Sequence, residues 1–291
     1  MLKRITMPVP STSSLRFGYF GRAGSFSHVA ALRRFPKADL CECPTVEESF
    51  ARLQAGEFSH IVVPIENASS GIITNTADQL MRLAKSDAGH GHALQIREAL
   101  AMRVQLALMA RADTKVIRKI YSHRAPFDHG RDWLQKHYPQ AEQIIVESTS
   151  QAAALAAKEK DSAAIAGEQA MAQHRLKIVS KHVGSEVANQ TTFIVVGAPL
   201  PRSSKPTHTS LVFELPHKAG SLVAVLQVLS RRKLNLTKIL SRPIPGRFEE
   251  YRFMIEFHGA APAPVVIQAL ARLEKITTFL AIIGSYPVRR V

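Results

Sequence analysis

Cysteine and long apolar runs are what this 291-residue chain has least of. Its two cysteines, Cys41 and Cys43, are separated by one residue, which suits neither a normal disulfide nor half of a zinc site. Two free thiols are typical of a reducing compartment, so we expect a cytoplasmic protein. No apolar run approaches the ~18 residues of a membrane span. The opening MLKRITMPVPSTSS lacks the apolar core of a signal peptide, and we expect a short disordered lead and no membrane association.

Acidic residues are also scarce relative to basic ones. The chain has 38 Lys and Arg against 23 Asp and Glu, a formal net charge of +15. A basic chain attracts anions, either small acids or nucleic acid. The basic residues are scattered, however, and no helix-turn-helix, zinc-finger or aromatic-basic RNA motif is present. We therefore expect a solvated basic surface and no nucleic-acid partner. No metal, nucleotide or flavin motif is present either, so we expect no metal and no cofactor.

Strand and helix patterns alternate along residues 16 to 200, which predicts an α/β domain with mostly parallel pairing. HIVVPIEN is predicted to be a buried strand that Pro64 ends. Two such alternating series predict two lobes. Lobe one covers about 16–100 and 186–200, and lobe two about 101–185. The expected helices are 27–35, 45–54, 74–84, 127–137 and the Ala-rich STSQAAALAAKEK.

A second domain is predicted after the segment GAPLPRSSKPTH, residues 197–208. Pro, Ser and basic residues dominate this segment, which is typical of a linker. The following residues, 208–291, alternate as strand, helix, strand, strand, helix and strand. This βαββαβ order predicts a ferredoxin-like fold.

Several blocks resemble the prephenate dehydratase family with a C-terminal ACT domain, and they follow one another in the family's order and spacing. The blocks are GRAGSFSHVAA, VVPIENASSG, YSH, STSQAA, AAIAGEQA and NQTTFIVVG, followed by TSLVFELP, GSLV and NLTKILSRP. The resemblance covers nearly all of residues 16–291. It implies a two-lobed catalytic domain like that of periplasmic binding proteins, then a regulatory ACT domain.

The resemblance also implies a reaction. Members of this family convert prephenate to phenylpyruvate, with loss of water and carbon dioxide. Thr191 stands at the family's signature Thr position, and we assign it the hydrogen bond to the departing hydroxyl. Glu66 and Asn67, from the PIEN block, are assigned to position groups beside it. Capping of local backbone amides is an equally good interpretation of Glu66 and Asn67.

Further residues are expected to bind substrate because they stand in the same blocks. Each has a simpler interpretation as a turn, a helix cap or a strand residue. The expected substrate contacts are Gly24, Ser25, Ser27, Ala68, Gly71, His123, Arg124, Ser148, Thr149, Thr192 and Phe193.

The chain departs from the family pattern at several of these positions. Thr192 stands where the family carries Arg, Ala68 where it usually has Ser, and Ile72 where it usually has Ser or Thr. Thr cannot replace the bidentate fork that a guanidinium offers a carboxylate. Three interpretations follow. The chain is a dehydratase in which Arg124 or Arg22 supplies the missing cation, or a prephenate decarboxylase that retains the hydroxyl, or an inactive ligand-binding regulator.

The ACT segment is expected to sense a small molecule and to assemble. By resemblance, phenylalanine binds between ACT domains through two motifs, here Gly220-Ser221-Leu222 and Ser241-Arg242-Pro243. The residue before the second motif is Leu240, where the family has Glu, and this puts phenylalanine control in question. Because edge strands in small sheets commonly pair across subunits, we expect a homodimer or homotetramer.

Overall fold

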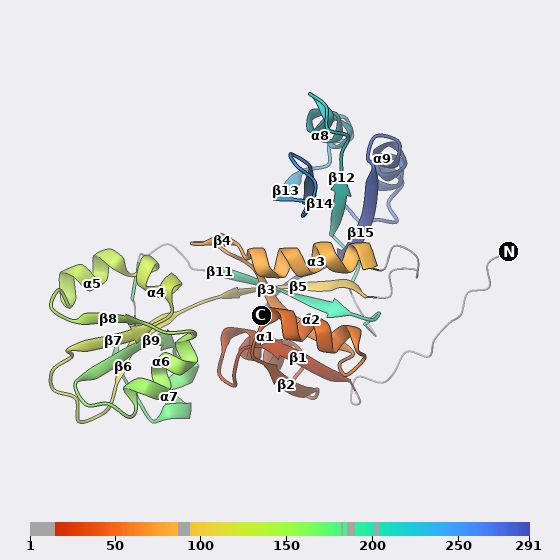
Figure 1. Ribbon diagram of the computed structural model, residues 1–291. Helices are drawn as coiled ribbons and strands as arrows, with labels where there is room; N and C mark the ends of the chain where they lie inside the picture. Colours follow the sequence, from red (N-terminus) through yellow and green to blue (C-terminus); the bar gives the residue numbers. More distant parts are fainter. Residues whose placement is uncertain (1–14, 87–93, 182, 185–189, 201–203) are drawn as a thin grey trace.

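The computed structural model describes residues 15–86, 94–181, 183–184, 190–200 and 204–291. The disordered lead expected before the first strand lies outside these residues. Figure 1 shows two lobes side by side, with the C-terminal domain standing on lobe one.

One eleven-stranded sheet runs through both lobe one and the C-terminal domain. The two parts meet where β15 and β16 pair with β5, each in parallel. In spatial order the strands are β13 (Leu236–Pro243), β14 (Tyr251–His258), β12 (His208–Glu214), β15 (Phe279–Tyr286), β5 (Gln95–Arg103), β11 (Gln190–Gly197), β3 (His60–Asn67), β1 (Arg16–Phe20) and β2 (Asp39–Cys43), with β4 (Gly71–Ile72) beside β3 and β16 (Val288–Arg290) beside β5.

Lobe two contains a separate five-stranded sheet. Its strands, in spatial order, are β10 (Lys177–Ser180), β6 (Leu106–Ala110), β9 (Ser162–Gly167), β7 (Lys119–Ser122) and β8 (Glu142–Ile145). Its helices are α4 (Arg124–His129), α5 (Arg131–His137), α6 (Thr149–Ala156) and α7 (Gln169–His174). The chain enters this lobe between β5 and β6 and leaves it between β10 and β11 (Figure 1). The two connections place the ends of β5 and β11 at the junction between the lobes.

Helices cover both faces of the C-terminal part of the large sheet. The helices of lobe one are α1 (Phe26–Arg34), α2 (Val46–Gln54) and α3 (Thr74–Ser86), and those of the C-terminal domain are α8 (Ser221–Arg231) and α9 (Pro264–Glu274). Residues of α8 and α9 pack with Leu211 and Ile255 on one face. On the other face, Leu80 and Met81 of α3 share a core with Met254 and Ile283. The catalytic and C-terminal parts are therefore joined by a continuous apolar core.

The sequence predictions fail at several element boundaries. Pro64 does not end its strand, because β3 continues to Asn67. Pro64 stands opposite Phe193, next to a bulge in β3 itself, where Ile65 has no opposite residue on β11, and a bulge is a place where a strand tolerates the missing proline donor. The helix expected over 127–137 is two helices, α4 and α5, separated by Gly130. Strands β2, β10 and β16 were not expected at all.

Candidate active site

The three residues assigned to catalysis lie on two neighbouring strands, β3 and β11. In the antiparallel pairing Thr191 stands opposite Asn67, and Thr192 stands opposite Glu66. Successive side chains of a strand point to opposite faces of the sheet. Asn67 and Thr191 therefore share one face, and Glu66 and Thr192 share the other. The structure brings Thr191 and Asn67 together and separates both from Thr192 and Glu66.

A direct hydrogen bond joins Asn67 to Thr191. The Nδ2 atom of Asn67 donates to the Oγ1 atom of Thr191 over 2.8 Å. The Oδ1 atom of Asn67 accepts from the backbone N–H groups of Ser69 (2.9 Å) and Ser70 (3.2 Å). Backbone amides can only donate, so these bonds fix which side-chain atom of Asn67 is the oxygen. Thr191 consequently receives a proton donor, and its own hydroxyl proton is directed away from Asn67.

The opposite face of the strand pair meets the C-terminal domain. Lys238 of β13 extends its Nζ atom to Glu66 Oε2 (3.2 Å) and to Glu256 Oε1 (2.6 Å). Thr192 lines a cavity of about 10 Å³ together with Lys238, Glu256 and Tyr286. Burial alone would lower the pKa of Lys238, but the two carboxylates outweigh burial and raise it. Glu66 and Thr192 are thus interface residues, and we remove Thr192 from the expected substrate contacts.

Phe193 also does not fit the substrate contact expected for it. Its side chain is 1% exposed and packs in the core with Val62 and Leu100. Because Phe193 stands two residues beyond Thr191 on β11, its ring faces the same side of the sheet, the α1 side, and fills that core. Its contribution is to packing beneath Thr191.

The glycine turn of lobe one touches lobe two. Gly24, at φ +80°, accepts a hydrogen bond at its carbonyl from Gln169 Nε2 of α7 (3.2 Å). A Cβ at Gly24 would meet the side-chain oxygen of Gln173, which can move aside, so it is the positive φ that favours glycine here. Ser25 caps α1 by accepting from the His28 N–H, and Ser27 is buried. The turn therefore lies at the junction, with Ser25 engaged as a cap.

The PIEN turn makes a second contact across the junction. Ser69 Oγ lies 3.2 Å from the Nδ1 atom of His129 in α4. The neighbouring Ala68 is exposed, and Gly71 adopts φ +78° with open space around it. This contact places Asn67, two residues before Ser69, close to lobe two.

The expected lobe-two residues stand just beyond the C-terminal ends of β7 and β8. His123 is the N-cap of α4, and burial lowers its pKa, which favours the neutral imidazole. Arg124 is three-quarters exposed and lies 3.7 Å from Asp128. Ser148 caps α6 by accepting from the Gln151 N–H (3.1 Å), and Thr149 is the first residue of that helix. These residues offer hydroxyls, helix amides and one exposed cation.

The two expected effector motifs are not brought together within the chain. Gly220 precedes α8 at φ +84°, and Ser221 and Leu222 line a cavity of about 150 Å³ with Tyr251. The second motif is on the edge strand β13, where Arg242 makes a bidentate ion pair with Asp78 of α3 (2.7 Å for each bond). Ser241 and Pro243 point away and are exposed.

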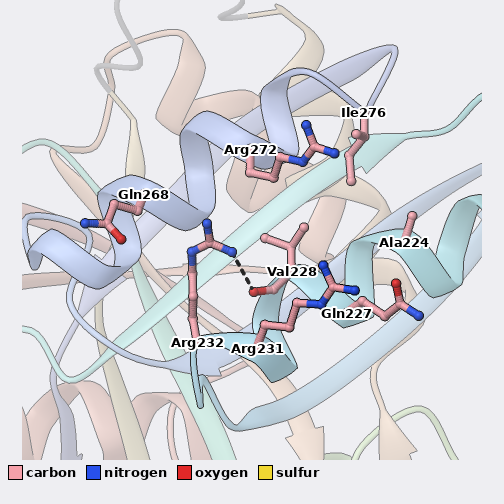
Figure 2. A pocket seen from close by; sticks show the side chains of 8 residues that line it. All are labelled: Ala224, Gln227, Val228, Arg231, Arg232, Gln268, Arg272 and Ile276. Atoms are coloured by element: carbon pink, nitrogen blue, oxygen red, sulfur yellow. Dashed lines mark hydrogen bonds between the residues drawn. The ribbon is translucent and has the colours of Figure 1, made fainter.

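A larger cavity lies elsewhere, between α8 and α9. It measures about 460 Å³, and Figure 2 shows the side chains of Arg231, Arg232 and Arg272 around it, with Gln227 and Gln268 at its sides. Arg232 donates to the Val228 carbonyl over 3.2 Å. No carboxylate, hydroxyl or imidazole lines this cavity, so it offers no group for acid–base chemistry. Proximity to Thr191 and Asn67 is the better guide to the active site.

Sequence reasoning missed one contact residue at the junction between the lobes and one at the interface with the ACT domain. Gln169 stands inside the quoted block AAIAGEQA, and Lys238 inside NLTKILSRP, yet neither was singled out. Polar residues inside an otherwise apolar block were the available signal. Among the described residues no group of His, Cys, Asp or Glu could hold a metal ion. Across the same residues, no helix is long and apolar enough to cross a membrane.

Comparisons with known proteins agree with this geometry. The family model for prephenate dehydratase matches residues 17–200, and the ACT domain model matches residues 209–275. The bifunctional chorismate mutase/prephenate dehydratase of Neisseria gonorrhoeae is 32% identical, over 94% of this chain and 74% of that protein. The prephenate dehydratase of Amycolatopsis methanolica is 30% identical, over 93% and 88%.

A solved structure leads to the same class of protein. The prephenate dehydratase of Arthrobacter aurescens, in complex with L-Phe, has a TM-score of 0.82 and 28% identity, over 94% of this chain and 90% of that one. Fold and site together define a two-lobed α/β lyase with a C-terminal ACT domain. The chain belongs to the prephenate dehydratase family, which confirms the resemblance and the fold class predicted from the sequence.

Proposed function

We propose that this protein converts prephenate to phenylpyruvate, water and carbon dioxide at the junction between its lobes. The observation that carries the proposal is the hydrogen bond from Asn67 to Thr191 at that junction. Because the Asn67 amide donates to the Thr191 oxygen, the hydroxyl proton of Thr191 points away from Asn67 and can be donated to a ligand. Membership of the family supports the choice of prephenate as substrate.

The chemistry requires a donor at the leaving oxygen. As the bond between the ring and its carboxylate breaks, its electron pair moves into the ring and the C–O bond on the opposite side of the ring breaks. The departing hydroxide takes up a proton and leaves as water, and the aromatic ring drives both losses. A threonine hydroxyl is far too weakly acidic to give up its proton outright. Thr191 therefore donates a hydrogen bond that stabilises the developing negative charge, and the net proton comes from solvent.

Substrate contacts are proposed from both sides of the junction. Gly24 and Ser25 precede α1, and Ser148 and Thr149 stand at the start of α6, so we place the two carboxylates at the N-termini of these helices. The N–H groups of Gly24 and Ser25 themselves donate to His28 Nδ1 and to the Arg22 carbonyl, and they shape the turn. Arg124 is the proposed cation, because its guanidinium is largely exposed beside the same strand ends. Binding between lobes holds the dianion in one orientation, which lowers the entropic part of the barrier.

The decarboxylase alternative loses its main support in this geometry. That alternative rested on Thr192 as a missing carboxylate ligand. Thr192 faces the ACT domain instead, so its identity does not set the polarity of the substrate site. The pair that would expel the hydroxyl, Asn67 and Thr191, is intact.

Regulation and assembly are proposed from the ACT domain. The cavity beside Ser221 and the edge strand β13 carry the two effector motifs, and one chain keeps them apart. Pairing of β13 with a second copy would bring the motifs of two subunits together, so we propose a homodimer with phenylalanine as effector. The L-Phe complex of the Arthrobacter aurescens relative supports this choice. A cytoplasmic location is proposed with it.

A matched pair of variants tests the proposed activity. Thr191→Val removes one hydroxyl while keeping the shape of the side chain, and Thr192→Val does the same on the opposite face. Wild-type protein is expected to release phenylpyruvate from prephenate. Loss of an oxyanion-type donor costs about a hundred- to a thousandfold in kcat, and this is expected for Thr191→Val alone. A product that retains the hydroxyl, or equal effects of the two variants, would contradict the proposal.

A further inference from the structure

A buried polar network connects the ACT domain to the strand pair that carries the proposed active site. Its centre is Lys238 of β13, whose ammonium bridges Glu256 of β14 and Glu66 of β3. Glu256 also accepts from Tyr286 Oη (2.6 Å) and from Thr237 Oγ1 (2.6 Å). The side chains of Lys238 and Glu256 are 14% and 9% exposed, so solvent screens that pair little, whereas Glu66 is 36% exposed and its bond to Lys238 is screened more.

The network and the proposed active site are one residue apart on both β3 and β11. Glu66 is followed by Asn67 on β3, and Thr192 is preceded by Thr191 on β11. Since neighbouring side chains of a strand point to opposite faces, a force on Glu66 turns the backbone that carries Asn67. The bond from Asn67 to Thr191 requires that backbone to stay in place. Glu66 thus links a cation on one face of the sheet to the hydroxyl donor on the other.

The strand that supplies the cation also carries an effector motif. Lys238, Leu240 and Arg242 are alternate residues of β13 and face the catalytic part, where Arg242 binds Asp78 and Leu240 packs on the shared core. The intervening residues Ile239 and Ser241 face away and are exposed. Any displacement of β13 is therefore transmitted directly to the Lys238 ammonium and to Glu66.

We propose that Lys238 is a positioning residue for the dehydratase reaction, holding Glu66 so that Asn67 and Thr191 stay aligned, and that it reports the state of the ACT domain to the active site. This proposal rests on the proposed function. It assigns Glu66 a different role from the catalytic one expected from the sequence, because Glu66 contacts Lys238 and faces away from Thr191.

The test is a double-mutant cycle on prephenate turnover by the full-length protein. Lys238→Met and Glu66→Gln are each expected to lower kcat by about three- to thirtyfold, the range that indirect coupling spans, with KM nearly unchanged. The double variant is expected to lose no more than the worse single variant, because each change breaks the same link. Lys238→Arg, which keeps the charge, is expected to recover most of the lost kcat.

Glu66→Gln keeps the result interpretable if Lys238→Met folds poorly. It leaves the ion pair between Lys238 and Glu256 in place and removes only the link to β3. Lys85→Met is the matched control, since Lys85 of α3 pairs with Glu214 (3.3 Å) and lies over the ring of Phe279, two residues of the ACT domain. This control is expected to keep wild-type kcat.

The outcomes separate the inference from the proposed function. A wild-type protein that forms no phenylpyruvate would overturn both. Active wild type with an unchanged kcat in Glu66→Gln would overturn the inference alone. Multiplicative losses in the double variant would also overturn it, as would an equal loss in the Lys85 control, because either result means that the contact stabilises the fold without aligning the site.

Discussion

Replacing Asn67 with Asp tests the hydrogen-bond direction on which the reaction depends. The change is isosteric and keeps an oxygen for the Ser69 and Ser70 amides, so the turn is preserved. It replaces the Nδ2 donor, which lies 2.8 Å from Thr191 Oγ1, with a carboxylate oxygen. A carboxylate can only accept, so the threonine proton turns toward Asp and away from the substrate.

The expected loss in kcat follows from the hydrogen bond that the Thr191 hydroxyl no longer donates to the substrate. Loss of a hydrogen bond to a developing oxyanion costs about 2.7–4 kcal/mol, or about a hundred- to a thousandfold in kcat. The added negative charge also repels a dianionic substrate and raises KM. At 4 Å and an effective dielectric of 20, one pair of like charges costs about 4 kcal/mol before screening. We therefore expect Asn67→Asp to reduce kcat/KM more than Thr191→Val, which adds no charge.

The assay is steady-state formation of phenylpyruvate from prephenate, with Asn67→Ser as the neutral comparison. Asn67→Ser is expected to lower kcat without the additional rise in KM. Raised ionic strength is expected to lower the KM of Asn67→Asp partway toward the wild-type value, but not to restore its kcat. If Asn67→Asp kept kcat within threefold of wild type, the hydrogen-bond direction inferred for Thr191 would be refuted.

Three further predictions concern stability and the ACT interface. Glu98 is fully buried between Arg34 and Arg289, so Glu98→Gln is expected to lower the free energy of unfolding by about 3 kcal/mol, measured by urea denaturation. Burial lowers the pKa of His60 to about 4. The unfolded state, near 6.5, then binds more protons, so stability is full above pH 6.5 and falls by about 3 kcal/mol toward pH 4, a loss that His60→Gln should remove. Thr192→Arg is expected to give no gain in phenylpyruvate formation, because it adds a cation beside Lys238 and none at the substrate site.

Much of the fold could be predicted from the sequence because its periodicities are local. The βαββαβ order of the C-terminal domain follows from strand and helix patterns that match β12, α8, β13, β14, α9 and β15. Strand β16 was missed because VRR carries no alternating apolar pattern, and it forms only by pairing with β5. Pro64 was misplaced because a bulge at Ile65, in its own strand, accommodates it. Such pairings are tertiary, and local patterns do not encode them.

The residue types of the candidate site could be predicted from the sequence, but the face of the sheet on which each residue lies could not. Asn67 and Thr191 stand in the two blocks that resemble the family, and a hydrogen bond joins them, while their part in catalysis stays a prediction. Thr192 was assigned to the same site, although the period of two in a strand should have separated it from Thr191. Lys238 could not have been found this way, because its contact with Glu66 depends on how the ACT sheet lies on α3 and β3.

The departures from the family pattern at Thr192 and Leu240 can be understood as one change at the ACT interface. Leu240 stands opposite Met254, and Met254 lines the same small cavity as Thr192 and Lys238. An arginine at 192 would place a second cation beside Lys238 and would need an added carboxylate nearby, which a glutamate at 240 could supply. With Thr and Leu, both charges are absent and the shared core is more apolar. Both departures therefore lie on the side of the sheet where the catalytic part meets the ACT domain, opposite the face that carries the hydrogen bond between Asn67 and Thr191.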